Sequence, residues 1–194
     1  MDMITLFIAC ETTGAWQWRL PDNDPAQPHV VRVVAIARTD NGTGIDEFCT
    51  LIRPEADWHF EDGAVNAHGI TAAVAADRGQ PAEAVRDRLG RLLLMANIVV
   101  GFGLDFQLRT LRRLFDDAPA PIPAGQFCCM KVARDVVKKP RMQPGGGYAI
   151  PTFAETYRHI AGAELPTSDD PIDAGLLKVS AVRTIYDGLM RGKS

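Results

Sequence analysis

The segment Thr5-Leu6-Phe7-Ile8-Ala9-Cys10-Glu11-Thr12-Thr13-Gly14 says most about the fold, because an apolar run stops there at a glutamate, two threonines and a glycine. A short apolar run that ends at a turn signal is typical of a strand buried on both faces of a sheet. Glu11 therefore lies where this strand leaves the core. A strand that carries a carboxylate to its exposed end indicates a functional site.

The segments that follow predict the rest of an α/β domain. Residues 30–38 are apolar and β-branched, Asn41-Gly42 is a hairpin signal, and residues 47–53 predict the returning antiparallel strand. The helical spacing of apolar residues then predicts helices over residues 81–95 and 104–115, with a short buried strand between them.

Composition limits the class of protein. The chain has 194 residues, 46% hydrophobic and 23% charged, which suits one domain spanning residues 1–194. We find no apolar run long enough to cross a membrane and no basic segment before the first apolar run, so we expect a cytoplasmic protein with no membrane contact. The four cysteines have no CxxC spacing, which disfavours a zinc site. With a net charge of −3, any binding of nucleic acid needs a local basic surface.

Two segments offer side chains that suit nucleic acid. Residues 15–28 predict a loop that carries Trp16 and Trp18, which either stack on nucleobases or, as we favour, pack the loop onto the sheet. Residues 131–141 hold five basic side chains against one aspartate. This segment, with Lys138 and Lys139, could line a phosphate path, or it could be an ordinary solvated helix end.

The opening segment resembles the first motif of the DEDD 3′-to-5′ exonuclease superfamily, the ribonuclease H-like nucleases that include proofreading exonucleases. That motif is Asp-x-Glu-Thr-Thr-Gly, and this chain has Ala9 at the Asp position, followed by Glu11-Thr12-Thr13-Gly14. The run His68-Gly69-Ile70-Thr71 is similar to a connecting segment of the same family. Taken alone, His68 is better explained as a hydrogen-bonded structural histidine.

The second family motif, His-Asn-x-x-Phe-Asp-x-x-x-Leu, resembles residues 102–111, with Gln107 at the aspartate. Asp105 lies two positions earlier, about 200° around a helix, so it faces away from Gln107 and suits a first-turn acid. The third motif, His-x-Ala-x-x-Asp-Ala, resembles residues 168–174, with Ser168 at the histidine and Asp173 at the aspartate. Ser168 to Pro171 also has the pattern of a helix start.

The resemblance spans residues 4–186 and implies an α/β, ribonuclease H-like fold. We therefore expect a mixed five-stranded sheet whose first three strands are antiparallel, with helices on both faces. The family hydrolyses phosphodiesters with two divalent ions held by acidic residues. Of the four expected carboxylates only Glu11 and Asp173 remain, so these two are the candidate catalytic and metal-binding residues. Ala9, Gln107 and Ser168 are the degenerate positions.

Two functions follow from the resemblance. In the first, the chain is a pseudoenzyme that binds single-stranded nucleic acid or its 3′ end, with impaired or absent hydrolysis and no bound metal; a protein partner is a further option. Its candidate nucleic-acid-binding residues are Thr12, Thr13, Gly14, Trp16, His68, Lys138 and Lys139. In the second, it is an active exonuclease that uses Mg²⁺ or Mn²⁺, seen either as a form inactivated at Ala9 or with compensating acids. The compensating acids would be Asp105, Asp169 or Asp170.

Overall fold

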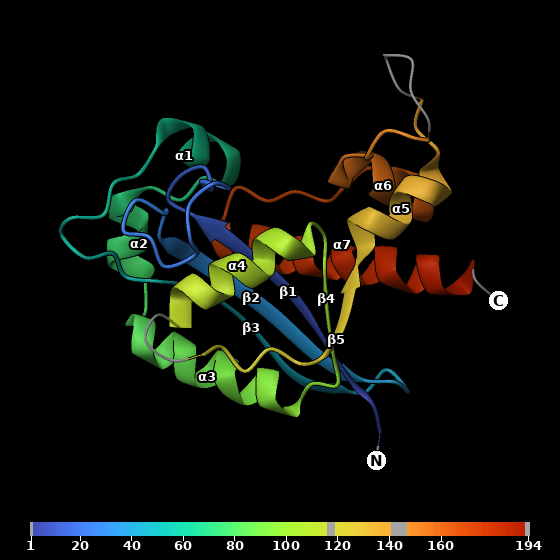
Figure 1. The fold of residues 1–194 in the computed structure, drawn as a ribbon, viewed down its shortest axis with the longest axis horizontal. Coiled ribbons are helices and arrows are strands. Elements are labelled where there is room, and N and C mark those ends of the chain that lie inside the picture. Colours follow the sequence, from blue (N-terminus) through green and yellow to red (C-terminus); the bar gives the residue numbers. More distant parts are fainter. Residues whose placement is uncertain (1, 116–118, 141–146, 193–194) are drawn as a thin grey trace.

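The strand predicted at the opening segment is the middle strand of a five-stranded sheet, ordered β3-β2-β1-β4-β5 (Figure 1). The strands are β1 (Ile4–Thr12), β2 (Val30–Thr39), β3 (Gly44–Leu51), β4 (Ile98–Gly101) and β5 (Gly125–Cys128). Strands β1, β2 and β3 pair antiparallel, whereas β4 and β5 continue the sheet in parallel from β1. The predicted mixed sheet is confirmed. This computed structural model describes residues 2–115, 119–140 and 147–192.

Helices cover both faces of the sheet, as predicted (Figure 1). They are α1 (Asp62–His68), α2 (Ala72–Arg78), α3 (Ala82–Met95), α4 (Leu104–Phe115), α5 (Cys129–Val137), α6 (Phe153–Ala161) and α7 (Pro171–Arg191). Within the described parts of the chain, no helix is long and apolar enough to pass through a bilayer.

The side chains of β1 alternate between two cores, because successive residues of a strand point to opposite faces. Leu6, Ile8 and Cys10 pack in the core under α3 and α4. Phe7 and Ala9 pack on the other face in the core under α7. Since Glu11 follows Ala9 by two positions, it belongs to the α7 face, and its side chain lies at the edge of that core.

The long helix α7 begins as its sequence predicts. The carboxylate of Asp170 accepts from the backbone N–H groups of Ile172 and Asp173 at 2.8 and 3.1 Å, and Pro171 occupies the first turn. One turn on, a Cβ at Gly175 would lie 2.7 Å from Cys49 Sγ, which is too close for any larger residue. Glycine at this position therefore lets α7 approach β2 and β3 closely.

Candidate functional site

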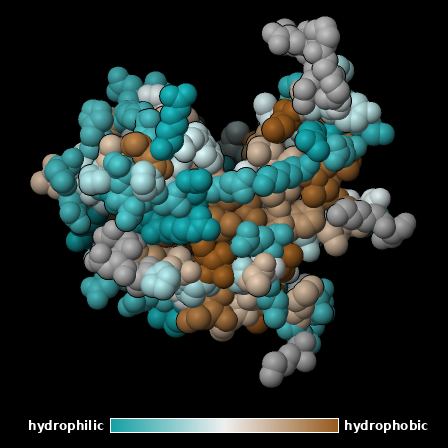
Figure 2. Space-filling view, in the orientation of Figure 1, coloured by the Kyte–Doolittle hydropathy of each residue, from teal (hydrophilic) through white to brown (hydrophobic). Residues whose placement is uncertain are grey.

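A pocket of about 450 Å³ opens where β1 leaves the sheet. Its walls come from the ends of β1 and α1, from β2, from the start of α6, from α7 and from the segment that leads into it. Figure 2 shows a notch in the surface between the part that carries α1 and the part that carries α5 and α6. The polar side chains of the lining are Glu11, Arg32, His68, Thr167, Ser168, Asp169 and Lys178. Three of the predicted site residues, Glu11, His68 and Ser168, therefore lie in one pocket.

The carboxylate of Glu11 is bound by two cationic side chains. Arg32 Nη2 donates to Oε1 at 3.2 Å, and the ammonium of Lys178 donates to the same oxygen. Burial alone would raise the pKa of Glu11, but the positive charges of Lys178 and Arg32 together hold that pKa below its ordinary value of 4.5. Glu11 is therefore ionised at neutral pH and acts as the shared counter-ion of both cations.

Arg32 is fixed from two sides. It lies opposite Glu11 in the β1–β2 register, and its Nη1 donates to the carbonyl of Pro171 at 2.5 Å. Its side chain is only 4% exposed, so its charge needs a nearby anion to offset the loss of water. An arginine inside the apolar run of residues 30–38 is a signal of such a partner, and our sequence-based prediction of the site missed it.

Lys178 was also missed. It stands on α7 directly before the fully buried Val179. The close approach at Gly175 brings this part of α7 down onto the sheet, so that the ammonium of Lys178 reaches Glu11. No short-range pattern in the sequence predicts that contact, because it depends on how the helix docks.

The positions that resemble two lost acids have structural roles. Ala9 is 3% exposed and packs in the apolar core with Val34, Val100 and Val179. Gln107 is also buried, and its Oε1 accepts from the backbone N–H of Cys10 at 2.6 Å. This amide thus satisfies a buried donor of β1 beyond the last residue pair of the β1–β4 ladder. Neither side chain lines the pocket.

Gln107→Ala should lower the free energy of unfolding by about 1–3 kcal/mol, because the buried N–H of Cys10 would lose its acceptor. The measurement is urea denaturation followed by circular dichroism. Asp105→Ala is the matched control on the same helix, since the Asp105 carboxylate is exposed and pairs with Lys131 at 2.8 Å. Equal stability of both variants and the wild type would contradict the structural role of Gln107.

The remaining candidate acids differ in whether they line the Glu11 pocket. Asp173 is exposed on the first turn of α7 and does not line the pocket, although its neighbour Ala174 does. A shared metal site of Glu11 and Asp173 stays a prediction. Asp105 pairs with Lys131, and Asp170 with Arg78 at 2.6 Å. Of the three proposed compensating acids, only Asp169 lines the pocket.

The side chains around Glu11 do not fit a two-metal centre. Hard divalent ions require several oxygen ligands, chiefly carboxylates. In the parts of the chain that the structure describes, no three His, Cys, Asp or Glu side chains gather closely enough to hold a metal ion. The carboxylate that remains is already neutralised by an arginine and a lysine. The pocket therefore places Arg32 and Lys178 beside Glu11, whereas the chemistry of the family needs further carboxylates there.

His68 and the two threonines of the first motif each make hydrogen bonds to the backbone or accept from it. His68 Nδ1 accepts from the N–H of Ile70 at 3.0 Å, so the ring proton lies on Nε2, which donates to the Thr12 carbonyl at 3.1 Å. Burial lowers the pKa of His68, which keeps the ring neutral. The Thr13 hydroxyl accepts from the N–H of His29 at 3.1 Å. These contacts match the structural interpretation of His68.

Gly14 and the loop that follows it are held tightly. A Cβ at Gly14 would lie 2.4 Å from the Glu61 carboxylate, which accepts from the N–H of Ala15 at 3.0 Å. Further along, Trp16 is 7% exposed and packs edge-on against Phe106 with ring centroids 6.1 Å apart. Of the two alternatives for this side chain, packing of the loop rather than stacking on a nucleobase therefore describes Trp16.

The basic segment at residues 131–141 is largely paired with acids. Lys139 Nζ donates to both oxygens of the Glu155 carboxylate, at 2.7 and 2.9 Å, and Lys131 pairs with Asp105. Lys138 ends α5 in the left-handed conformation, with φ of 51°. Arg141 lies outside the described residues. The phosphate path along this segment stays a prediction.

Comparison with known proteins shows the family of this chain. No curated protein matches the sequence. Among solved structures, the zinc-bound complex of E. coli exonuclease I with single-stranded DNA is 17% identical with a TM-score of 0.73, and covers 100% of this chain and 41% of that chain. The E. coli exonuclease I complex with a 5cy-dT13 oligonucleotide is 18% identical with a TM-score of 0.73, and covers 100% of this chain and 41% of that chain.

A complex of exonuclease I with SSB-Ct is 18% identical with a TM-score of 0.68, and covers 98% of this chain and 42% of that chain. At these identities the likeness shows the fold, and the chain spans about two fifths of the length of the structures that it matches. The family model RNase T, described as Exonuclease, matches residues 6–162. The chain thus belongs to the RNase T exonuclease family, within the DEDD superfamily that its motifs resemble.

Proposed function

We propose that this chain is a single exonuclease-like domain of the cytoplasm that binds single-stranded nucleic acid at its 3′ end, with impaired or absent hydrolysis. The observation that carries the proposal is the pairing of Glu11 with both Arg32 and Lys178. One carboxylate between two cations leaves a group of net positive charge, which repels a divalent ion. In contrast, an anionic phosphate is attracted by the same two side chains.

The general base of the family chemistry has no replacement at its position. Ser168 lines the pocket, but its hydroxyl accepts from the N–H of Asp170 at 3.2 Å and belongs to the start of α7. Loss of a positioned base costs about 10²–10⁴-fold in rate. Hydrolysis would thus be slow even if a divalent ion bound near Glu11.

The choice of ligand follows from the pocket and from the similar structures. E. coli exonuclease I has been solved with single-stranded DNA and a dT13 oligonucleotide, and exonuclease I has been solved with SSB-Ct. We infer that a single strand enters the Glu11 pocket of this chain with its 3′ end first. A protein partner is a further proposal, supported by the same likeness.

The alternative function is an active 3′-to-5′ exonuclease that uses Mg²⁺ or Mn²⁺. One observation favours it, because Asp169 lines the same pocket as Glu11 and could serve as a second acid. It requires that a divalent ion displace Lys178 from the Glu11 carboxylate. The two functions therefore differ in whether metal binding changes the contacts of Glu11.

Fluorescence anisotropy with a labelled single strand tests the proposal. We expect the same affinity in EDTA and in Mg²⁺, and weaker binding of a circular strand that has no end. Oligothymidylate and oligouridylate arms identify whether the strand is DNA or RNA. Binding that requires Mg²⁺ would contradict the proposal and favour the active exonuclease. If the protein binds no single strand at all, the proposed binding function is wrong.

Reversing the charge of Lys138 and Lys139 to glutamate should weaken binding of the single strand. If both side chains bind phosphates, the slope of log affinity against log salt should fall by about 0.7 for each phosphate that is no longer neutralised. The control is the double reversal Arg88→Glu and Arg91→Glu on α3, which makes the same change of net charge at two exposed arginines outside this segment. Arg88 pairs with Asp46 as Lys139 pairs with Glu155, so the two variants are matched. An unchanged affinity and slope would exclude this segment from the binding surface.

A further inference from the structure

The two tryptophans of the loop of residues 15–28 differ in their exposure to solvent. Trp16 is buried, whereas Trp18 is 57% exposed. Burial of an aromatic side chain is a large source of stability, so the mostly exposed Trp18 contributes less to folding than the buried Trp16. Exposed aromatic side chains of this kind are common where a protein binds a ligand.

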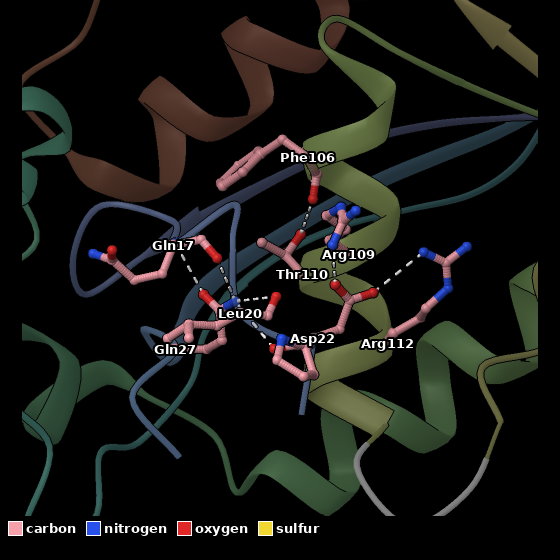
Figure 3. Close-up of polar contacts among 9 residues, drawn as sticks. Gln17, Leu20, Asp22, Gln27, Phe106, Arg109, Thr110 and Arg112 are labelled. Atoms are coloured by element: carbon pink, nitrogen blue, oxygen red, sulfur yellow. Dashed lines mark hydrogen bonds and ion pairs between the residues drawn. The ribbon is translucent and has the colours of Figure 1, made fainter. Parts of the chain in front are cut away.

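The loop that carries the exposed Trp18 is held by polar contacts around Gln27, which Figure 3 shows. The buried amide of Gln27 donates to the carbonyls of Gln17, Leu20 and Pro21, and accepts from the N–H of Gln17 at 3.0 Å. Trp18 is the residue directly after Gln17. The loop is therefore fixed before any ligand binds, which lowers the entropic cost of binding through Trp18.

A second set of contacts docks the loop on α4 (Figure 3). The carboxylate of Asp22 accepts from Arg109 at 2.5 Å and from Arg112 at 3.4 Å. The guanidinium of Arg109 also lies 5.6 Å from the centre of the Trp18 ring. Arg109 thus links the docking of the loop to the orientation of the exposed ring, through a cation–π contact.

The surroundings of Trp18 are cationic in a chain whose net charge is −3. Arg109, Arg112 and the exposed Arg19 provide three positive charges, against the two carboxylates of the loop, Asp22 and Asp24. An aromatic ring among positive charges suits a nucleobase and the phosphates on either side of it. A neutral or basic peptide would gain much less from these charges.

The loop begins at the site itself, because Gly14 closes the motif that carries Glu11. Trp18 follows Glu11 by seven positions, so the two residues lie at most about 25 Å apart even along a fully extended chain. A single strand whose 3′ end enters the pocket could therefore place one of its upstream bases on Trp18.

We propose that Trp18, on the loop of residues 15–28 beside Arg109 and Arg112, is a stacking platform for a nucleobase of the bound single strand. This inference rests on the proposed binding of single-stranded nucleic acid and assigns part of it to one side chain. Stacking is tolerant of base identity because every base has a π-face, so the platform would fix the path of the strand rather than its sequence.

The test measures the affinity of oligothymidylate by fluorescence anisotropy. Trp18→Ala should bind about 5- to 150-fold more weakly, the range expected from loss of one base–aromatic stack, while Trp18→Phe should stay close to the wild type. Leu94→Ala is the matched control, because Leu94 is an exposed apolar side chain on α3. The salt dependence of binding should be unchanged in Trp18→Ala, since stacking releases no counter-ions.

A series of strands with one abasic position each then identifies the stacked base. The wild type should bind one member of the series more weakly than the others, and Trp18→Ala should bind all members alike. If the wild type binds the strand but Trp18→Ala binds equally well, the platform is wrong and the proposed function stands. If the wild type binds no single strand, both are wrong. If Trp18→Ala weakens binding of a protein partner but not of the single strand, the assignment of Trp18 to a nucleobase is also wrong.

Discussion

Glu11→Gln should lower the free energy of unfolding by up to about 3–5 kcal/mol, the cost of breaking a buried ion pair. The substitution keeps the size of the side chain but removes its charge, leaving the 4% exposed Arg32 without an anion. Lys178 is 35% exposed, so water screens its share of the loss. Urea denaturation of the two proteins gives the difference directly.

The sign of this change separates two roles of Glu11. In a metal site without its ions, neighbouring carboxylates repel one another. Removing the charge of one of them would therefore leave the metal-free protein as stable or more stable. A counter-ion of resident cations stabilises the metal-free fold, so its removal destabilises. Glu164→Gln is the control, because it breaks the exposed pair with Arg158 and should have a much smaller effect. A Glu11→Gln protein that is more stable than the wild type would contradict the counter-ion role.

The same role predicts a dependence on pH. Because the pKa of Glu11 is lowered in the folded protein, its contribution to stability is complete above its ordinary value of 4.5. That contribution is lost as the pH falls below this value through the folded-state pKa. In Glu11→Gln this part of the acid destabilisation should be missing.

The second large effect concerns restoration of hydrolysis. Ala9→Asp alone should leave hydrolysis of single strands at background, because Arg32 and Lys178 would still occupy the Glu11 carboxylate. The new carboxylate would also be buried in an apolar core, which favours its neutral form. Activity should appear only when Gln107→Asp, Ser168→His and Lys178→Met are added, with the restored base contributing about 10²–10⁴-fold.

The outcomes of this series distinguish three histories of the site. Strong exonuclease activity in Ala9→Asp alone would show that this position is the sole block, and the binder proposal would fail. Activity only in the combined variant would show that several steps removed the chemistry from an exonuclease-like scaffold. A combined variant that folds but binds no Mn²⁺ would show that the cleft geometry itself has diverged.

Most of the fold could be predicted because its signals are local. The apolar run that ends at Glu11, the Asn41-Gly42 hairpin and the capped start at Asp170-Pro171 each specify an element without reference to distant residues. The mixed five-stranded sheet followed from the resemblance, since no short motif states which strands become neighbours.

The charge arrangement of the site could not be predicted in the same way. The contact of Glu11 with Arg32 depends on the register of β1 and β2, which are joined by a loop that does not fix it. The contact with Lys178 depends on the docking of α7, which a single close approach at Gly175 permits. Similarly, nothing short-range in the sequence indicates that Gln107 bonds to the backbone of Cys10.

The Glu11 pocket should hold a single strand without metal-dependent cleavage. This expectation is checked by denaturing gel electrophoresis of a 5′-labelled single strand after long incubation with the wild type in EDTA, Mg²⁺ or Mn²⁺. We expect a strand of full length in all three conditions, at protein concentrations where anisotropy shows that it is bound. Progressive shortening from the 3′ end in Mg²⁺ or Mn²⁺ that is absent in EDTA and in Glu11→Gln would contradict the proposed binding role.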